Sequence, residues 1–156
     1  MHVLVTGSTG FIGRFLIPQL LQERRITAVT LLLREPYRHH PLPAPLHQLR
    51  PQCNVVYADL RHFDETVRAV RQAAPQTVIH LAAVGATAPF LAVETAVCHN
   101  LNGTLNLLRA CFEENEGSEQ LIVARTPGER LGINPYAASK AAVWEFCRMY
   151  ARTRGW

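Results

Sequence analysis

The sequence has 156 residues, of which 48% are hydrophobic and 18% are charged, a composition that indicates one globular domain and excludes a disordered chain. The net charge of +4 is mild and the arginines are spread along the chain, so nothing predicts binding to nucleic acid. No apolar run could span a bilayer, no secretory signal begins the chain and the four cysteines form no CxxC pair, so we expect a cytoplasmic protein without disulfides or zinc.

The first thirteen residues, MHVLVTGSTGFIG, predict a strand, a tight turn and the start of a helix. An apolar run ends at Thr6, and three glycines then follow, at Gly7, Gly10 and Gly13. Glycine at such a turn permits a positive φ and lets the backbone approach a ligand. The N-terminus of the next helix offers unpaired N–H groups and partial positive charge, which suit a pyrophosphate. The turn is therefore a candidate dinucleotide-binding site.

Apolar runs and helical periodicities then alternate along the rest of the chain. The expected elements are strands over 3–5, 28–33, 55–58, 77–83 and 121–124, and helices over about 11–24, 64–74, 90–114 and 135–154. The stretch 36–51 holds five prolines and three histidines, so we expect a surface loop there rather than a regular helix or a central strand. Its histidines have no carboxylate or thiolate at ligand spacing, so we expect no metal site.

This alternation predicts an α/β fold, a doubly wound parallel sheet (Rossmann) of five strands with flanking helices over residues 1–156. Ligands of such sheets bind beyond the carboxyl ends of the strands. The glycine turn and the motifs described below all fall at that edge.

A tyrosine and a lysine stand four residues apart in the last expected helix, at Tyr136 and Lys140. On a helix this spacing puts both side chains on one face, about one turn apart. A phenol has a pKa near 10 and is a poor base, but an ammonium within roughly 4–6 Å lowers that pKa. Such a pair could move the proton of an alcohol while hydride passes to or from a cofactor. The alternative is an ordinary surface pair, and the preceding strand–helix units favour the catalytic interpretation.

Five motifs in order resemble the extended short-chain dehydrogenase/reductase family of NAD-dependent epimerase/dehydratase type. They are TGSTGFIG at 6–13, DL at 59–60, HLAA at 80–83, NLNGTLNLL at 100–108 and PYAASKAA at 135–142. The resemblance covers the whole chain, which corresponds to the N-terminal cofactor-binding part of the family. It implies an NAD(P)-dependent oxidoreductase, epimerase or dehydratase that transfers hydride on a hydroxyl- or carbonyl-bearing small molecule, with nucleotide sugars as the suggested class.

The resemblance also implies roles for single residues. For the dinucleotide these are Gly7, Gly10 and Gly13 on the pyrophosphate, Phe11 and Ile12 in the turn, Asp59 and Leu60 beside the adenine, Ala82 and Ala83 along the cleft, Asn100 ordering the site and Lys140 on the nicotinamide ribose. Tyr136 is implied as the catalytic base, with Lys140 tuning its pKa.

The stretch after the fifth expected strand departs from the family pattern. Members place a Ser-Ser or Ser-Thr pair there, and its hydroxyl helps to bind the substrate oxygen. Here the strand leads into ARTPG at 124–128, and Tyr136 follows only ten residues after Thr126. Thr126 is the only hydroxyl in this stretch for that catalytic role.

The end of the second strand bears on the choice of cofactor. An acidic residue there suits the ribose diol of NAD, whereas an arginine suits the 2′-phosphate of NADP. The residue here is Arg34, followed by Glu35, so we expect NADP slightly ahead of NAD. The alternative is a solvated Arg–Glu pair with no part in binding.

The family continues into a sixth strand and a substrate domain that this sequence does not contain. The chain is therefore interpreted as a fragment of a longer protein, as one that needs a partner, or as a degenerate relative, with an unpaired strand at one sheet edge. A non-catalytic dinucleotide-binding or sensor module is the alternative function, and RNA binding, known for some relatives, is a third. Family members pair through the helices expected over 90–114 and 135–154, which makes a homodimer a further prediction.

Overall fold

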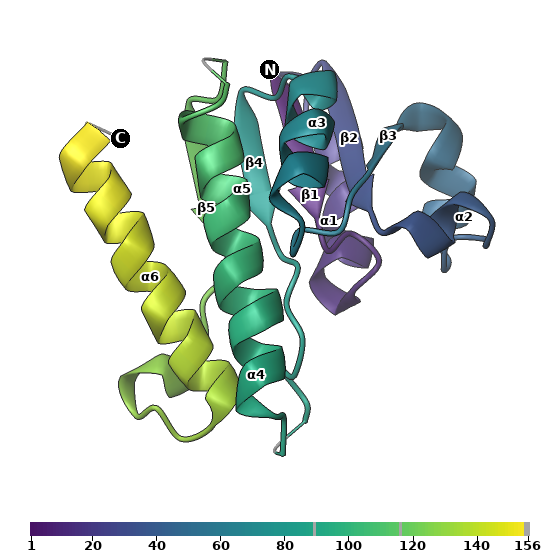
Figure 1. Cartoon of the computed structure of the whole chain (residues 1–156). Helices are drawn as coiled ribbons and strands as arrows, with labels where there is room; N and C mark the ends of the chain where they lie inside the picture. The colour runs from purple at the N-terminus through teal and green to yellow at the C-terminus, as the bar shows by residue number, and fades with distance from the viewer. Residues whose placement is uncertain (89, 116, 155–156) are drawn as a thin grey trace.

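The architecture is a parallel sheet between helices. In a computed structural model, residues 1–88, 90–115 and 117–154 are described, and within them five strands form one sheet in the order β3-β2-β1-β4-β5 (Figure 1). The strands are β1 (His2–Thr6), β2 (Ala28–Leu33), β3 (Asn54–Tyr57), β4 (Thr77–His80) and β5 (Gln120–Val123). Every neighbouring pair is parallel, which confirms the predicted fold class.

Helices follow the strands as the periodicity predicts. They are α1 (Phe11–Gln22), α2 (Leu46–Leu49), α3 (Phe63–Ala73), α4 (Val93–Ala96), α5 (Gly103–Phe112) and α6 (Pro135–Arg154). A π-helical turn over Val97–Asn102 joins α4 to α5, so the expected long helix has a widened turn in its middle.

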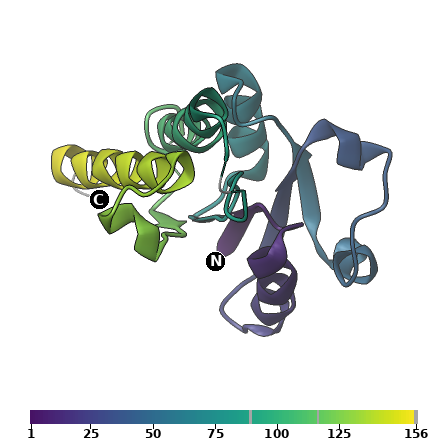
Figure 2. The same cartoon turned by 90° about the horizontal axis from the view of Figure 1, so that it is seen from below.

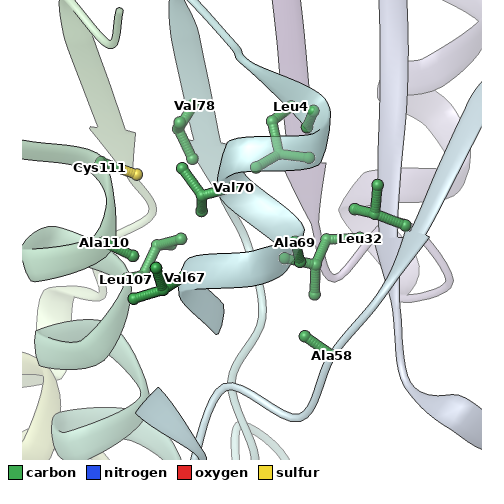
Figure 3. Close-up of a cluster of buried hydrophobic side chains, with 12 residues drawn as sticks. Leu4, Leu32, Ala58, Val67, Ala69, Val70, Val78, Leu107, Ala110 and Cys111 are labelled. Carbon is green, nitrogen blue, oxygen red and sulfur yellow. The ribbon is translucent and has the colours of Figure 1, made fainter. Parts of the chain in front are cut away.

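The sheet separates two apolar cores, and the molecule has three layers (Figure 2). Successive strand residues point to opposite faces. Leu4 therefore contributes to the core under α3 and α5, while Val3 and Val5 contribute to the core under α1 and α2. Figure 3 shows Leu4, Leu32 and Val78 of the strands meeting side chains of α3 and α5. Burying each large apolar side chain stabilises the fold by roughly 1.5–3 kcal/mol.

The expectation of a loop without helix over 36–51 was wrong. The segment from Glu35 to Gln52 contains α2 and two short 3-10 helices, at Glu35–Arg38 and Arg50–Gln52. Prolines sit in the first turn of each 3-10 helix, where the missing N–H costs nothing. Leu42 and Leu46 are buried in the core under α1, so this segment also covers part of the sheet.

Two further element ends differ from the expected bounds by three residues, and the others differ by at most two. β4 stops at His80, so Leu81, Ala82 and Ala83 lie beyond the strand. The helix expected from about residue 90 begins at Val93.

The strand order reverses between β1 and β4, whose carboxyl ends diverge to helices on opposite faces. This is the switch point at which ligands bind in open α/β sheets. β5 lies at one edge of the sheet, and its Ile122 is 45% exposed. The fold thus offers a cleft at the switch point, and β3 and β5 are the two edge strands of the sheet among the described residues.

Candidate functional site

A cleft of about 220 Å³ lies beyond the carboxyl ends of β1 to β4. Several predicted cofactor residues line it, namely Gly7, Gly10, Arg34, Asp59, Leu60, Ala82 and Ala83. They come from four separate loops, and the parallel sheet brings those loops to one edge. Thr6, Ser8, Tyr37, Arg61 and His99 also line the cleft, and sequence reasoning gave them no role.

The glycine turn has the geometry of a close backbone approach. Gly7 has φ +69, and a Cβ built on it would lie 2.5 Å from the backbone nitrogen of Ala82. A Cβ on Gly13 would lie 2.4 Å from the carbonyl oxygen of Ser8, because the first turn of α1 packs directly on the loop. The Gly10 N–H donates to the Gly7 carbonyl at 3.0 Å and closes the turn. Larger residues would therefore push the loops apart at Gly7 and Gly13.

The N-terminus of α1 faces this turn with unused donors. The first intrahelical bond runs from the Arg14 N–H to the Gly10 carbonyl at 3.1 Å, so the N–H groups of residues 11–13 precede the ladder. The Ser8 hydroxyl is fully buried and has no hydrogen-bond partner among the described residues. Open N–H groups, helix dipole and orphan hydroxyl together fit a pyrophosphate. The side chains of Phe11 and Ile12 are exposed, so any role in this turn belongs to their backbone.

Asp59 lies at the far end of the cleft and is held by a neighbouring arginine. The Arg61 guanidinium contacts its carboxylate through Nε at 3.0 Å, and these bonds lower the pKa of Asp59 to about 2. Glu35 pairs with Arg38 at 2.5 Å rather than with Arg34, so the structure does not show the alternative of an Arg34–Glu35 pair. Arg34 is exposed on the cleft wall and has no ion-pair partner within the part of the chain that the structure describes.

Tyr136 and Lys140 lie in the first two turns of α6, as the spacing predicts, but neither lines the cleft. Lys140 is 4% exposed, and burial lowers its pKa. Burial and the Glu129 carboxylate raise the pKa of Tyr136. In the ligand-free chain these two causes act in the direction opposite to the lowering expected from Lys140, and the tuning role of Lys140 stays a prediction.

Glu129 is a buried carboxylate that sequence reasoning missed. It accepts a hydrogen bond from the Arg125 Nε at 2.7 Å and from the Thr126 N–H at 2.9 Å. Thr126 and Glu129 form a capping box at the short helix Pro127–Arg130, so the threonine hydroxyl faces the helix N-terminus. The T-x-x-E spacing was the available signal. The Arg125 guanidinium also stacks on Trp144 of α6, at 4.2 Å from the ring centre, which ties this segment to the helix.

Asn100 is fully buried in the π-helical turn and does not line the cleft. Its side chain accepts from the Val84 N–H at 2.8 Å and donates to the Val84 carbonyl at 3.0 Å and to the Ser139 hydroxyl at 3.0 Å. Val84 belongs to the cleft wall and Ser139 to α6. Asn100 therefore joins the two halves of the site by fixing the loop after β4 against the helix of Tyr136.

The described residues contain no group of three or more His, Cys, Asp and Glu placed to hold a metal. All four cysteines are free thiols, two of them buried and two half-buried. No helix in the described part of the chain is long and apolar enough to cross a membrane.

Comparison with known proteins gives a consistent family. A family model for the NAD dependent epimerase/dehydratase family matches residues 3–156. The UDP-glucose 4-epimerase of Mycoplasma pneumoniae is 31% identical, over 88% of this chain and 44% of that protein.

Solved structures share the fold. UDP-glucose 4-epimerase of Thermus thermophilus in complex with NAD superposes with a TM-score of 0.72 at 30% identity, over 99% of this chain and 52% of that one. The Thermotoga maritima UDP-glucose 4-epimerase with UDP-glucose gives a TM-score of 0.75 at 21% identity, over 99% of this chain and 52% of that one. The chain spans about half the length of the relatives that it matches.

Proposed function

The chain belongs to the NAD dependent epimerase/dehydratase family, and we propose that it is the dinucleotide-binding part of an NAD-dependent enzyme of this family. The proposed reaction is hydride transfer at a carbon that bears a hydroxyl or carbonyl group. Nucleotide sugars are the proposed substrate class, since similar proteins are named UDP-glucose 4-epimerases.

The single observation that carries the proposal is the cleft at the switch point with its glycine cradle. Because Gly7 has no Cβ, the backbone of Leu81 and Ala82 packs directly against the turn, and the first turn of α1 presents unused N–H groups beside it. The backbone of this turn would hold the pyrophosphate. Asp59 and Leu60 would bind beside the adenine, at the far end of the same cleft.

In the proposed chemistry, NAD held in the cleft would supply the acceptor and donor of the hydride. The chain contributes a proton-transfer group, the phenolic oxygen of Tyr136, and a buried ammonium on Lys140. Asn100 and Ser139 orient the start of α6, since the Ser139 hydroxyl donates to the Tyr136 carbonyl at 2.8 Å. A catalytic role for Thr126 stays a prediction, and its place in the capping box gives the hydroxyl a structural task as well.

NAD is the cofactor that we propose, because the matching family is described as NAD dependent and a similar structure holds NAD. Arg34 is the one residue that favoured NADP. Its guanidinium is exposed on the cleft wall, which makes it the position at which the choice between the two cofactors is best tested.

The test uses the chain as it stands. Calorimetry with NAD should show binding, and Tyr136→Phe should leave NAD affinity unchanged while it removes turnover of a UDP-sugar. Absence of NAD binding to the wild-type chain would refute the proposal. If NAD binds and Tyr136→Phe changes no detectable turnover, the chain is the alternative, a dinucleotide-binding or sensor module without catalysis.

We also propose a homodimer through α5 and α6. Phe146 and Met149 support it, because both are about 40% exposed on α6 and are large and apolar. A mass measurement in solution that gives a monomer at micromolar concentration would exclude it.

A further inference from the structure

His80 ends β4, directly before Leu81 of the cleft wall, and is only 1% exposed. Both of its ring nitrogens are engaged. Nδ1 lies 2.6 Å from the Thr6 hydroxyl of β1, and Nε2 lies 2.8 Å from the Thr104 hydroxyl of α5. One imidazole therefore bridges two neighbouring strands and a helix. The motif HLAA contains this histidine, but the function described above assigns it no task.

The protons of this cluster can be placed by counting donors. The Thr104 hydroxyl donates its only proton to the Asn100 backbone carbonyl at 2.6 Å, so it must accept at its contact with His80. The Thr6 hydroxyl accepts from the Ala82 N–H at 3.2 Å and is free to donate to the ring. His80 therefore carries its proton on Nε2 and accepts at Nδ1. The other tautomer would set two acceptors against each other at Thr104.

Further hydrogen bonds lead from Thr104 through Asn100 toward α6. After Thr104 donates to the Asn100 backbone carbonyl, the Asn100 side-chain amide donates to the Ser139 hydroxyl at 3.0 Å. Ser139 then donates to the Tyr136 carbonyl at 2.8 Å. Every hydroxyl and the imidazole in the series receive one hydrogen bond and donate one. The bonds from the Ala82 N–H to the Asn100 backbone carbonyl are consecutive and polarise one another, whereas the Asn100 side-chain amide begins a separate pair of bonds to Ser139 and the Tyr136 carbonyl.

We propose that His80, as the neutral Nε2–H tautomer, is a positioning residue that couples the dinucleotide cleft to the helix carrying Tyr136. One end of the coupling is Thr6 and Ala82, both in the cleft wall. The other end is the first turn of α6. This inference rests on the proposed function only where NAD affinity is measured, because the tautomer of His80 is a property of the ligand-free chain.

The charge state of His80 agrees with this role. Burial, together with the positive charge of Lys140, lowers the pKa of His80 to about 3. A protonated ring would have two donors and would oppose the Thr6 hydroxyl proton. The hydroxyls of Thr6 and Thr104 are the polar groups that contact the ring from β1 and α5, and neither titrates. The bridge should therefore hold across the whole neutral range.

The first experiment reads the tautomer directly. Long-range ¹H–¹⁵N correlation spectra of histidine-labelled protein give separate patterns for the two neutral tautomers and for the cation. The His80 signal is identified by its loss in His80→Gln. We expect the Nε2–H pattern, unchanged between about pH 5 and about pH 8, where a histidine with the ordinary pKa of about 6.5 changes its pattern. An Nδ1–H pattern, or a cation at neutral pH, would overturn the proposal.

The second experiment tests the coupling. His80→Phe keeps a ring and removes both hydrogen bonds, whereas His80→Gln keeps one donor and one acceptor. We expect His80→Phe to weaken NAD binding about two- to tenfold and His80→Gln to stay within about twofold of wild type. The ¹³C ring signal of Tyr136 should move in His80→Phe, while that of Tyr57, on β3, should not. Unchanged NAD affinity together with an unchanged Tyr136 signal would overturn the coupling.

A second variant and the ligand-free measurements distinguish the possible negative results. If His80→Phe does not fold, Thr104→Val removes the acceptor of the Nε2 proton and should move the same Tyr136 signal. If the wild-type chain binds no NAD, the proposed function falls, while the tautomer and the Tyr136 signal still decide the positioning role.

Discussion

The glycine cradle leads to a sharp prediction at Gly7. Alanine there would have to adopt φ +69, and its Cβ would lie 2.5 Å from the backbone nitrogen of Ala82 and 2.6 Å from the carbonyl carbon of Leu81. Both neighbours are backbone atoms, so no side-chain rotation can relieve the clash. We expect Gly7→Ala to move the loops after β1 and β4 apart and to distort the cleft that they line.

The magnitude follows from two costs. A left-handed backbone costs an L-residue roughly 1–2 kcal/mol, and overpacking typically costs about 1–3 kcal/mol more. The free energy of unfolding should therefore fall by about 2–5 kcal/mol. NAD affinity should fall at least about tenfold, which corresponds to about 1.4 kcal/mol.

Gly132 provides a matched control. It has φ +56, and a Cβ built on it would meet nothing within 4 Å. Gly132→Ala therefore has only the backbone cost of roughly 1–2 kcal/mol, and it should leave NAD affinity unchanged. Urea unfolding and calorimetry on the two variants check both expectations. If Gly7→Ala were no more destabilising than Gly132→Ala and bound NAD as wild type does, the cradle interpretation would be wrong.

Three further predictions concern charged side chains. Glu129→Gln should lower the pKa of both Tyr136 and Lys140, because the carboxylate raises the pKa of each. ¹³C NMR can follow both titrations, since Lys140 is the only lysine in the sequence, and unchanged pKa values would exclude a role of Glu129 in the site. Asp59 has a pKa of about 2 in the folded protein, below its ordinary 3.8, so the stability that it contributes should be complete above about pH 4 and disappear toward pH 2. Urea unfolding of Asp59→Asn should lack that acid-dependent loss, and an identical pH profile would contradict the assignment. Arg34→Ala should weaken NADP binding and leave NAD binding within about twofold if the guanidinium meets a 2′-phosphate, whereas equal losses for both cofactors would exclude that contact.

The sequence predicted the fold and the glycine turn because both depend on contiguous residues. Alternating apolar runs set the strands and helices, and glycine at position 7 can adopt the positive φ of +69 that the turn after β1 requires. Prediction failed over 36–51, where proline content suggested a loop. Proline in a first helical turn needs no N–H, and Leu46 anchors the segment in the core.

The parts of the site that sequence reasoning missed depend on distant contacts. Thr6 and His80 are 74 residues apart, and His80 and Thr104 are 24 apart, yet they meet within hydrogen-bond distance. No local pattern indicates such a bridge. Helical spacing places Lys140 near Tyr136 but says nothing of burial or of the Glu129 carboxylate, which raise the pKa of Tyr136 in the ligand-free chain.

The dinucleotide cleft and Tyr136 differ in whether each can act in the ligand-free chain. The cleft is set by backbone geometry and requires no change of charge to accept a dinucleotide. Tyr136 begins as a neutral phenol whose pKa is raised, so at neutral pH its resting oxygen can give a proton but can hardly take one. A base at this position needs additional positive charge nearby, and Lys140 alone does not supply it in the ligand-free chain. An oxidised nicotinamide is a cation, so under the proposed function occupancy of the cleft should come before proton abstraction at Tyr136. The Tyr136 pKa should then fall when NAD binds, and a titration of its ring signal with and without NAD decides the order.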